Sequence, residues 1–72
     1  NLSFDDLYRQ YIGKNVLNFF RQDFGYQQGT YQKVWSGKED NVHLAEILAS
    51  EDPSAADFQS RVYAALEARY PK

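Results

Sequence analysis

The sequence predicts an all-α fold of three helices, with a long glycine-punctuated loop between the first helix and the second. Apolar residues recur at helical spacing in three stretches, and Gly25, Gly29, Gly37 and Pro53 interrupt the pattern between them. A domain of 72 residues buries only about 60% of the surface that its unfolded chain exposes. We therefore expect residues 1–72 to form a single helical segment that belongs to a larger helical bundle.

The first helix is expected to span residues 3 to about 24. Ser3 is placed to cap its N-terminus, because a serine side chain accepts a hydrogen bond from a free backbone N–H. Asp5 and Asp6 follow in the first turn, where the helix dipole favours acidic residues. Gly25 is placed at the C′ position, which glycine occupies in many helices.

Apolar side chains occupy most of the circumference of this first helix, which is typical of a helix buried on several sides. Two short helices cannot cover all of them. We therefore expect a partner subunit, as in a homodimer, or a missing N-terminal part of the same protein to cover the rest. The apolar residues are Phe4, Leu7, Tyr8, Tyr11, Ile12, Val16, Leu17, Phe19, Phe20 and Phe24.

The loop is expected to span residues 25–38. Its part from Thr30 to Trp35 has the composition of an extended segment, but a single candidate strand does not predict a sheet. Trp35 could lie in the core or serve as a stacking platform, and we expect it to lie in the core. Gly29 is expected to have a positive φ, because the loop must reverse direction between Tyr26 and Tyr31.

Two further helices are expected after the loop. The second spans residues 39–49, and four of its apolar residues face the core: Val42, Leu44, Ile47 and Leu48. Pro53 separates it from the third, because the residue before a proline avoids helical geometry. The third helix is expected to be capped by Asp52 or Ser54 and to run to about Tyr70.

Charge and composition exclude several classes of function. Four basic residues and one acidic residue lie between Lys14 and Lys38, whereas the rest of the chain is acidic and the net charge is -2. This balance opposes general nucleic-acid binding and favours a small anionic ligand. The chain has no cysteine and no apolar run long enough to cross a bilayer. We expect a cytoplasmic protein that does not bind membranes.

One polar stripe interrupts the apolar surface of the first helix. Lys14, Asn18 and Arg21 follow one another at positions i, i+4 and i+7, which places them on one face. An ammonium, an amide and a planar guanidinium together suit an oxyanion such as phosphate. The alternative interpretation is a solvated face without a ligand.

The loop offers further groups for the same ligand. Tyr26, Tyr31 and Lys33 provide two hydroxyls and an ammonium between glycines that let the backbone approach a ligand closely. This combination suits a phosphate chain with a planar base nearby. The alternative is a surface loop packed by its own aromatic rings.

A metal site or a catalytic residue cannot be predicted from these residues. Metal-dependent phosphate chemistry needs converging carboxylates, whereas Glu39 and Asp40 are adjacent and diverge on a helix. Glu46 has no acidic neighbour one turn away, and His43 with Glu39 is expected to form a surface pair. The chain therefore has the groups of a binding site without those of a catalytic site.

Residues 11–41, YIGKNVLNFFRQDFGYQQGTYQKVWSGKEDN, resemble the C-terminal signature region of the dimeric all-α dUTPases. This family is related to the all-α nucleoside triphosphate pyrophosphohydrolases. The matching elements are LN and RQ in the first helix, followed by GY, GTY, a lysine, a tryptophan, a glycine and EDN. Where this chain has Gln27, the family often has a lysine.

The resemblance implies a role in the hydrolysis of dUTP to dUMP and pyrophosphate. It implies that the chain is the C-terminal portion of a larger dUTPase-like domain that forms a homodimer. It also implies Mg²⁺, held by glutamates and an aspartate that are not in this chain. By motif match, the phosphate and nucleotide contacts fall on Lys14, Asn18, Arg21, Tyr26, Tyr31, Lys33 and Asn41. The alternative is a non-catalytic helical module that binds a protein partner through its aromatic face.

Overall fold

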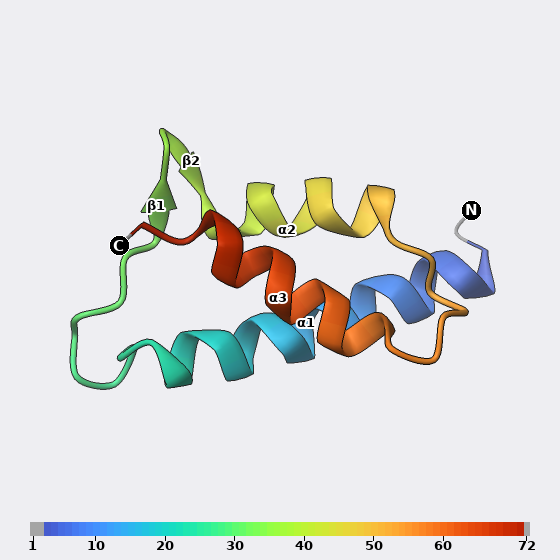
Figure 1. The fold of residues 1–72 in the computed structure, drawn as a ribbon, viewed down its shortest axis with the longest axis horizontal. Coiled ribbons are helices and arrows are strands. Elements are labelled where there is room, and N and C mark those ends of the chain that lie inside the picture. Colours follow the sequence, from blue (N-terminus) through green and yellow to red (C-terminus); the bar gives the residue numbers. More distant parts are fainter. Residues whose placement is uncertain (1–2, 72) are drawn as a thin grey trace.

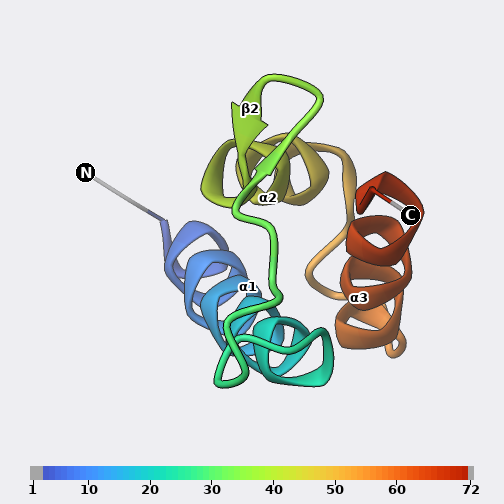
Figure 2. The ribbon, with the colours of Figure 1, turned by 90° about the vertical axis from the view of Figure 1, so that its left-hand side faces the viewer.

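The computed structural model describes residues 3–71 and contains three helices and a short hairpin. In chain order the elements are α1 (Phe4–Asp23), β1 (Val34–Trp35), β2 (Lys38–Glu39), α2 (Asp40–Ser50) and α3 (Phe58–Arg69). Viewed end-on, the helices stand at three corners, and the segment between α1 and β1 runs across the open end (Figure 2). The mostly helical fold is confirmed, and the small two-stranded sheet makes the description as all-α approximate.

Both ends of α1 have the capping interactions that the sequence predicts. Ser3 Oγ accepts a hydrogen bond of 3.2 Å from the backbone N–H of Asp6. At the other end Tyr26 N donates to Arg21 O at 2.9 Å and Gly25 N donates to Gln22 O at 3.3 Å. This pair of bonds is a Schellman motif, and Gly25 supplies the positive φ of 93° that the motif requires.

The hairpin was not predicted, because each of its strands has only two residues. Val34 pairs with Glu39 and Trp35 pairs with Lys38 in an antiparallel register. The two residues between them, Ser36 and Gly37, have φ values of 52° and 82°. Positive φ at both central residues is the geometry of a type I′ turn, whose twist matches that of the flanking strands.

The third helix begins later than the sequence predicts. Asp52 Oδ1 accepts hydrogen bonds from the backbone N–H of Ser54 at 2.9 Å and from its hydroxyl at 2.8 Å. These bonds close a local turn, and α3 starts only at Phe58, with Asp57 at the N-cap. The assignment of the cap to Asp52 or Ser54 is therefore wrong, because an aspartate can stabilise a turn as readily as a helix start.

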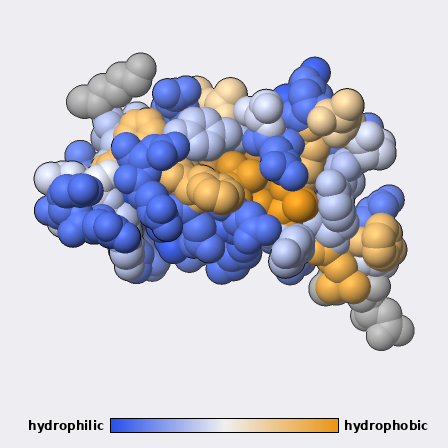
Figure 3. Space-filling model, turned by 90° about the horizontal axis from the view of Figure 1, so that it is seen from below, coloured by the Kyte–Doolittle hydropathy of each residue, from blue (hydrophilic) through white to orange (hydrophobic). Residues whose placement is uncertain are grey.

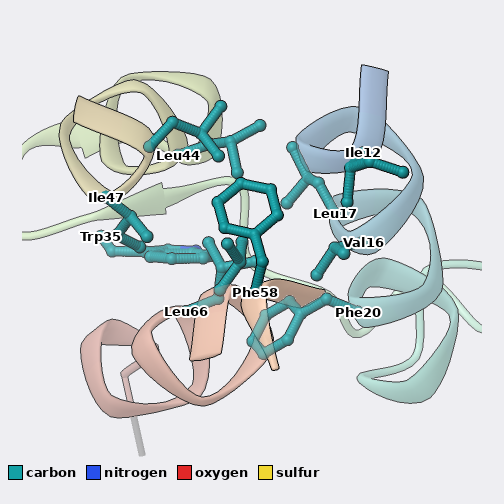
Figure 4. Close-up of a cluster of buried hydrophobic side chains, with 11 residues drawn as sticks. Ile12, Val16, Leu17, Phe20, Trp35, Leu44, Ile47, Phe58 and Leu66 are labelled. Carbon is teal, nitrogen blue, oxygen red and sulfur yellow. The ribbon is translucent and has the colours of Figure 1, made fainter. Parts of the chain in front are cut away.

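The core lies between the three helices and includes Trp35 from the hairpin. Phe58 projects from α3 between side chains of α1 and side chains of α2 (Figure 4). Trp35 is fully buried, as expected. Val42 is 44% exposed, so its assignment to the core is wrong: α2 turns Leu44, Ile47 and Leu48 toward the other helices instead. The buried apolar residues are Ile12, Val16, Leu17, Phe20, Trp35, Leu44, Ile47, Leu48, Phe58, Val62 and Leu66.

Helices α1 and α2 run antiparallel (Figure 1), and they approach each other closely at Gly13. A Cβ atom added at Gly13 would lie only 2.7 Å from Leu48 Cδ1, so the absence of a side chain at Gly13 allows this approach. Toward the other end of α1, Arg21 contacts Asp40 at the start of α2. These two contacts place one face of α1 along the length of α2.

Several large apolar side chains of α1 are exposed. Phe4 is 80% exposed, Tyr11 67% and Phe19 66%. Hydrophobic patches lie among hydrophilic residues on the face seen from below in Figure 3. That a partner covers these residues stays a prediction. Within residues 3–71, no helix combines the length and the hydropathy needed to cross a membrane.

Candidate functional site

A groove between α1 and α2 contains two of the predicted ligand residues. Lys14 from α1 and Asn41 from the first turn of α2 both line a cavity of about 430 Å³, a volume within the usual range for small-molecule pockets. Four small or apolar side chains of α2 line the same groove: Leu44, Ala45, Leu48 and Ala49. The remaining lining residues are Asp6, Arg9 and Gln10 of α1. The groove therefore combines an apolar wall with cationic and amide groups.

Arg21 and Tyr31, two further predicted ligands, meet at the carboxylate of Asp40, to which the sequence assigns no ligand role. Arg21 Nε donates to Asp40 Oδ2 at 2.9 Å and Arg21 Nη2 donates to Oδ1 at 3.1 Å, so the pair is bidentate. The hydroxyl of Tyr31 donates to Asp40 Oδ2 at 2.9 Å. Asp40 has no exposed surface. The result is a hydrogen-bonded triad that joins α1, the loop and α2.

The surroundings of Asp40 favour its charged form. Burial acts to raise the pKa of Asp40, but the hydrogen bonds from Arg21 and Tyr31 and the charge of Arg21 outweigh it. The pKa of Asp40 is therefore below its ordinary value. Burial and the hydrogen bond to Asp40 raise the pKa of Tyr31 far above the usual range. Tyr31 thus keeps its proton and directs it to Asp40.

Arg21, which the sequence predicts to be a phosphate ligand, also bonds within the protein. Two of its N–H groups are already bonded to a buried carboxylate, so Arg21 contributes to the fold. Removing one partner of a buried ion pair costs about 3–5 kcal/mol. A phosphate is therefore expected to bind the free donors of Arg21 without displacing Asp40. That Arg21 contacts phosphate stays a prediction.

The loop carries two more of the predicted ligand residues, Tyr26 and Lys33, at the end of the molecule where Arg21 bonds to Asp40. Gly29 has the expected positive φ, at 77°. The rings of Tyr26 and Tyr31 lie 6.1 Å apart between centroids, and Tyr26 is 53% exposed. Lys33 and Asn18 are also exposed. The structure thus unites Arg21 with Tyr31 and Lys14 with Asn41, and leaves the other three side chains at the surface.

His43 differs from the expected surface pair with Glu39. It is 6% exposed, and its ring stacks on Trp35 with centroids 5.0 Å apart. Its Nε2 donates to Trp35 O at 2.7 Å, and its Nδ1 accepts from Arg69 Nη1 at 3.1 Å. The expectation is wrong, because the hairpin folds Trp35 over the start of α2 and α3 supplies Arg69.

Arg9 is a groove residue that the motif match does not include. Its Nη1 lies 3.5 Å from Asp6 Oδ1. Its Nε is buried, and no hydrogen-bond acceptor among residues 3–71 reaches it. A buried donor of this kind is uncommon in folded proteins. The sequence feature that could have pointed to Arg9 is its position one helical turn before Gly13, because these two residues lie on the same face of α1 and that face approaches α2.

The described residues do not present a carboxylate set suited to Mg²⁺. Within residues 3–71 no three acidic, histidine or cysteine side chains converge on a point. Asp40 is bonded to Arg21 and Tyr31, and Glu46 is bonded to Lys38 and Arg69. No step that involves a metal can be derived from these side chains.

Comparison with protein-family models, with curated proteins and with solved structures finds no match to this chain.

Acidification is expected to destabilise the protein in part through Asp40. A carboxyl whose pKa is lowered by folding stabilises the folded state above its unfolded pKa, and this contribution is lost as the pH falls through the folded value. The window for Asp40 therefore lies below about pH 4. Glu46, whose pKa the hydrogen bonds from Lys38 and Arg69 lower to about 2, titrates in the same window.

Urea denaturation of the wild type and of Asp40→Asn at several pH values between 6 and 2 separates the two groups. The difference in unfolding free energy between the proteins should shrink as the pH falls below 4, because only the wild type then loses the charge of Asp40. A difference that stays constant over this range would contradict the assignment.

Proposed function

We propose that this chain is the phosphate- and nucleotide-binding portion of a dUTP pyrophosphohydrolase. In this role it holds the phosphate chain of dUTP and neutralises negative charge while the bond to pyrophosphate breaks. The choice of dUTP as the substrate rests on the motif resemblance of residues 11–41. No residue of the chain is proposed to be catalytic, and the metal-binding carboxylates that the resemblance implies are not among the described residues.

The observation that carries this proposal is the shared groove of Lys14 and Asn41. The two residues are far apart in the sequence and come from different helices, yet both line one cavity with an apolar wall. Asn18 lies between Lys14 and Arg21 on the same face of α1 by helical spacing. The polar stripe therefore runs from the groove to the triad, which is the extended shape that a triphosphate needs.

The donors that remain free define how such a ligand would bind. Lys14 contributes an ammonium, and Asn18 and Asn41 contribute amides, all on exposed side chains. Arg21 has one terminal nitrogen, Nη1, without a bond to Asp40. Charge-assisted hydrogen bonds from these groups to phosphate oxygens are the stronger kind. The base then lies toward the loop or the apolar wall of the groove.

Calorimetry with a dUTP analogue that has an imido group between the α and β phosphorus atoms tests the proposal. We expect binding to the chain, and Lys14→Gln should weaken it about 10-fold, since one charge-assisted bond is worth about 1.5–3 kcal/mol. Arg61→Gln is the matched control, because Arg61 is an exposed cation of α3 that pairs with Asp57 outside the groove. Equal affinities of all three proteins, or no binding at all, would refute the proposal.

The chain alone is expected to be inactive. Incubation with dUTP and Mg²⁺ should release no pyrophosphate above background, because the described residues do not bring carboxylates together. The measurement is a coupled pyrophosphate assay at high protein concentration. Magnesium-dependent release that disappears in Lys14→Gln would show that the chain carries catalytic groups after all.

A second function, as a helical module that binds a protein partner, is favoured by one observation. Phe4, Leu7, Tyr11 and Phe19 expose more than half of their surface on one helix, and exposed apolar patches of this kind mark interaction sites. The double variant Tyr11→Ser, Phe19→Ser separates the two functions. A nucleotide-binding role predicts unchanged affinity for the dUTP analogue, whereas a purely interaction-based role predicts no affinity in either protein.

A further inference from the structure

Asp40 forms hydrogen bonds with three of the seven predicted ligand residues and directly precedes a fourth, Asn41, although the motif match assigns no ligand role to it. Its carboxylate accepts hydrogen bonds from the side chains of Arg21 and Tyr31. Asn41, the next residue of α2, lowers the pKa of this carboxylate through its backbone N–H. The backbone N–H of Asp40 donates to Lys33 O at 2.8 Å. One residue therefore joins the predicted ligands of α1, the loop and α2.

These contacts fix orientations as well as positions. The two bonds from Arg21 involve both oxygens of Asp40, so the plane of the guanidinium is set by the carboxylate. The bond from Tyr31 sets the direction of its hydroxyl. The bond to Lys33 O holds the end of the loop against the first residue of α2. The ring of Tyr31 is also held by stacking on Tyr70, with centroids 5.6 Å apart, so Asp40 sets the direction of the hydroxyl and not the place of the ring.

We propose that Asp40 is the positioning residue of the phosphate site, which it organises by holding Arg21, Tyr31 and the backbone of Lys33 in one arrangement. This inference rests on the proposed function, because it concerns the ligands of that site. Asp40 does not itself contact the phosphate: it has no exposed surface, and a carboxylate beside a phosphate oxygen would be repelled.

The arrangement keeps the electrostatics favourable for an anion. Asp40 offsets one charge of Arg21, but Arg21 Nη1 remains without a bond to it. Lys14, at the groove, is not among the contacts of Asp40 and retains its full charge. Ligand binding then requires no rearrangement of Arg21, because a preoriented donor loses little freedom when it binds.

Binding of inorganic tripolyphosphate, measured by calorimetry, tests the inference. Asp40→Asn removes the charge and should weaken binding about 10-fold or more. The matched control is Glu46→Gln on the same helix, because Glu46 also accepts hydrogen bonds from an arginine and a lysine but contacts no predicted ligand. This control should bind within about twofold of the wild type.

A double-variant cycle of Asp40→Asn and Tyr31→Phe distinguishes the positioning role of Asp40 from a purely structural role. If Asp40 acts by orienting Tyr31, removing the hydroxyl weakens binding in the wild type and has no further effect in Asp40→Asn. A general loss of stability predicts instead that the two effects multiply. Circular dichroism at low temperature establishes that each variant is folded during the titration.

An NMR measurement on the wild type tests the same inference without any variant. The Nε–H signal of Arg21 should be slow to exchange with water, because the group is bonded to a buried carboxylate. It should persist, with a changed shift, when tripolyphosphate saturates the protein. Its disappearance on saturation would mean that the ligand displaces Asp40, and the inference would be wrong.

The outcomes also separate this inference from the function on which it rests. If the wild type binds neither tripolyphosphate nor the dUTP analogue, both fail. If the wild type binds and Asp40→Asn binds equally well, the proposed function survives and the positioning role of Asp40 is rejected. Weakened binding in Asp40→Asn, normal binding in Glu46→Gln and a non-multiplicative cycle support both.

Discussion

Replacing Arg21 by alanine is expected to lower the free energy of unfolding by about 3–5 kcal/mol, because it leaves the buried charge of Asp40 without its partner. A 72-residue domain has a total stability of about 4–11 kcal/mol at the usual value per residue. A loss of this size would largely unfold a domain at the low end of this range and would remove about half of the stability of one at the high end. Chemical denaturation followed by circular dichroism measures the loss.

Two further variants identify the cause of this loss. The double variant Arg21→Ala, Asp40→Asn should be more stable than Arg21→Ala alone, since it no longer buries an unpaired charge. Arg21→Lys should recover part of the stability, because an ammonium pairs with Asp40 without reproducing the bidentate geometry. If Arg21→Ala retains wild-type stability, the triad does not hold the loop to the helices.

Replacing Gly25 by alanine is expected to cost about 2–4 kcal/mol, the sum of backbone strain and a steric clash. Gly25 has a φ of 93°, and a Cβ atom there would lie 2.0 Å from Thr30 Oγ1. Thr30 cannot move away freely, because its backbone N–H and its hydroxyl both bond to Gly25 O. The thermal midpoint and urea denaturation both report the loss.

Gly29→Ala is the matched control for Gly25→Ala. Gly29 has a similar φ of 77°, but an added Cβ would meet nothing within 4 Å in the described residues. Only the backbone strain of about 1 kcal/mol should then remain. The double variant Gly25→Ala, Thr30→Ala should recover the steric part. Equal losses at both glycines would mean that the contact with Thr30 contributes nothing.

The parts of the fold that the sequence predicts correctly are those set by local interactions. The cap at Ser3 and the Schellman motif at Gly25 involve residues only a few positions apart. The apolar spacing of the three helices is likewise visible within one or two turns. The expectation that Trp35 lies in the core is confirmed.

The predictions that are wrong concern residues at which two local interactions compete, or residues whose burial depends on contacts with distant parts of the chain. Asp52 can cap a helix or close a turn, and its bonds to Ser54 select the turn. Val42 and Leu44 have similar hydropathy, and only the packing of α1 and α3 decides which is buried. His43 is buried because Trp35 and Arg69 reach it from two other elements.

The sequence predicted single residues of the candidate site, but it did not predict the hydrogen bonds that join them. Arg21 and Asp40 are 19 positions apart, and no periodic pattern links a helix residue to the first residue of a later helix. From the sequence alone, the side chain of Asp40 is considered only together with that of Glu39, as two adjacent carboxylates that diverge on a helix and therefore cannot bind the same metal ion. The role of Asp40 becomes visible only when the hairpin returns the chain to the end of α1.

The single tryptophan of the chain gives the molecule an intrinsic optical probe of its whole tertiary structure. The indole of Trp35 lies 5.7 Å from the ring of Phe20 in α1, 5.0 Å from that of His43 in α2 and 5.4 Å from that of Tyr70 after α3, measured between centroids. Undocking of any one helix changes its surroundings. Its fluorescence emission therefore reports the assembly of all three helices together, which far-ultraviolet dichroism of the separate helices cannot do.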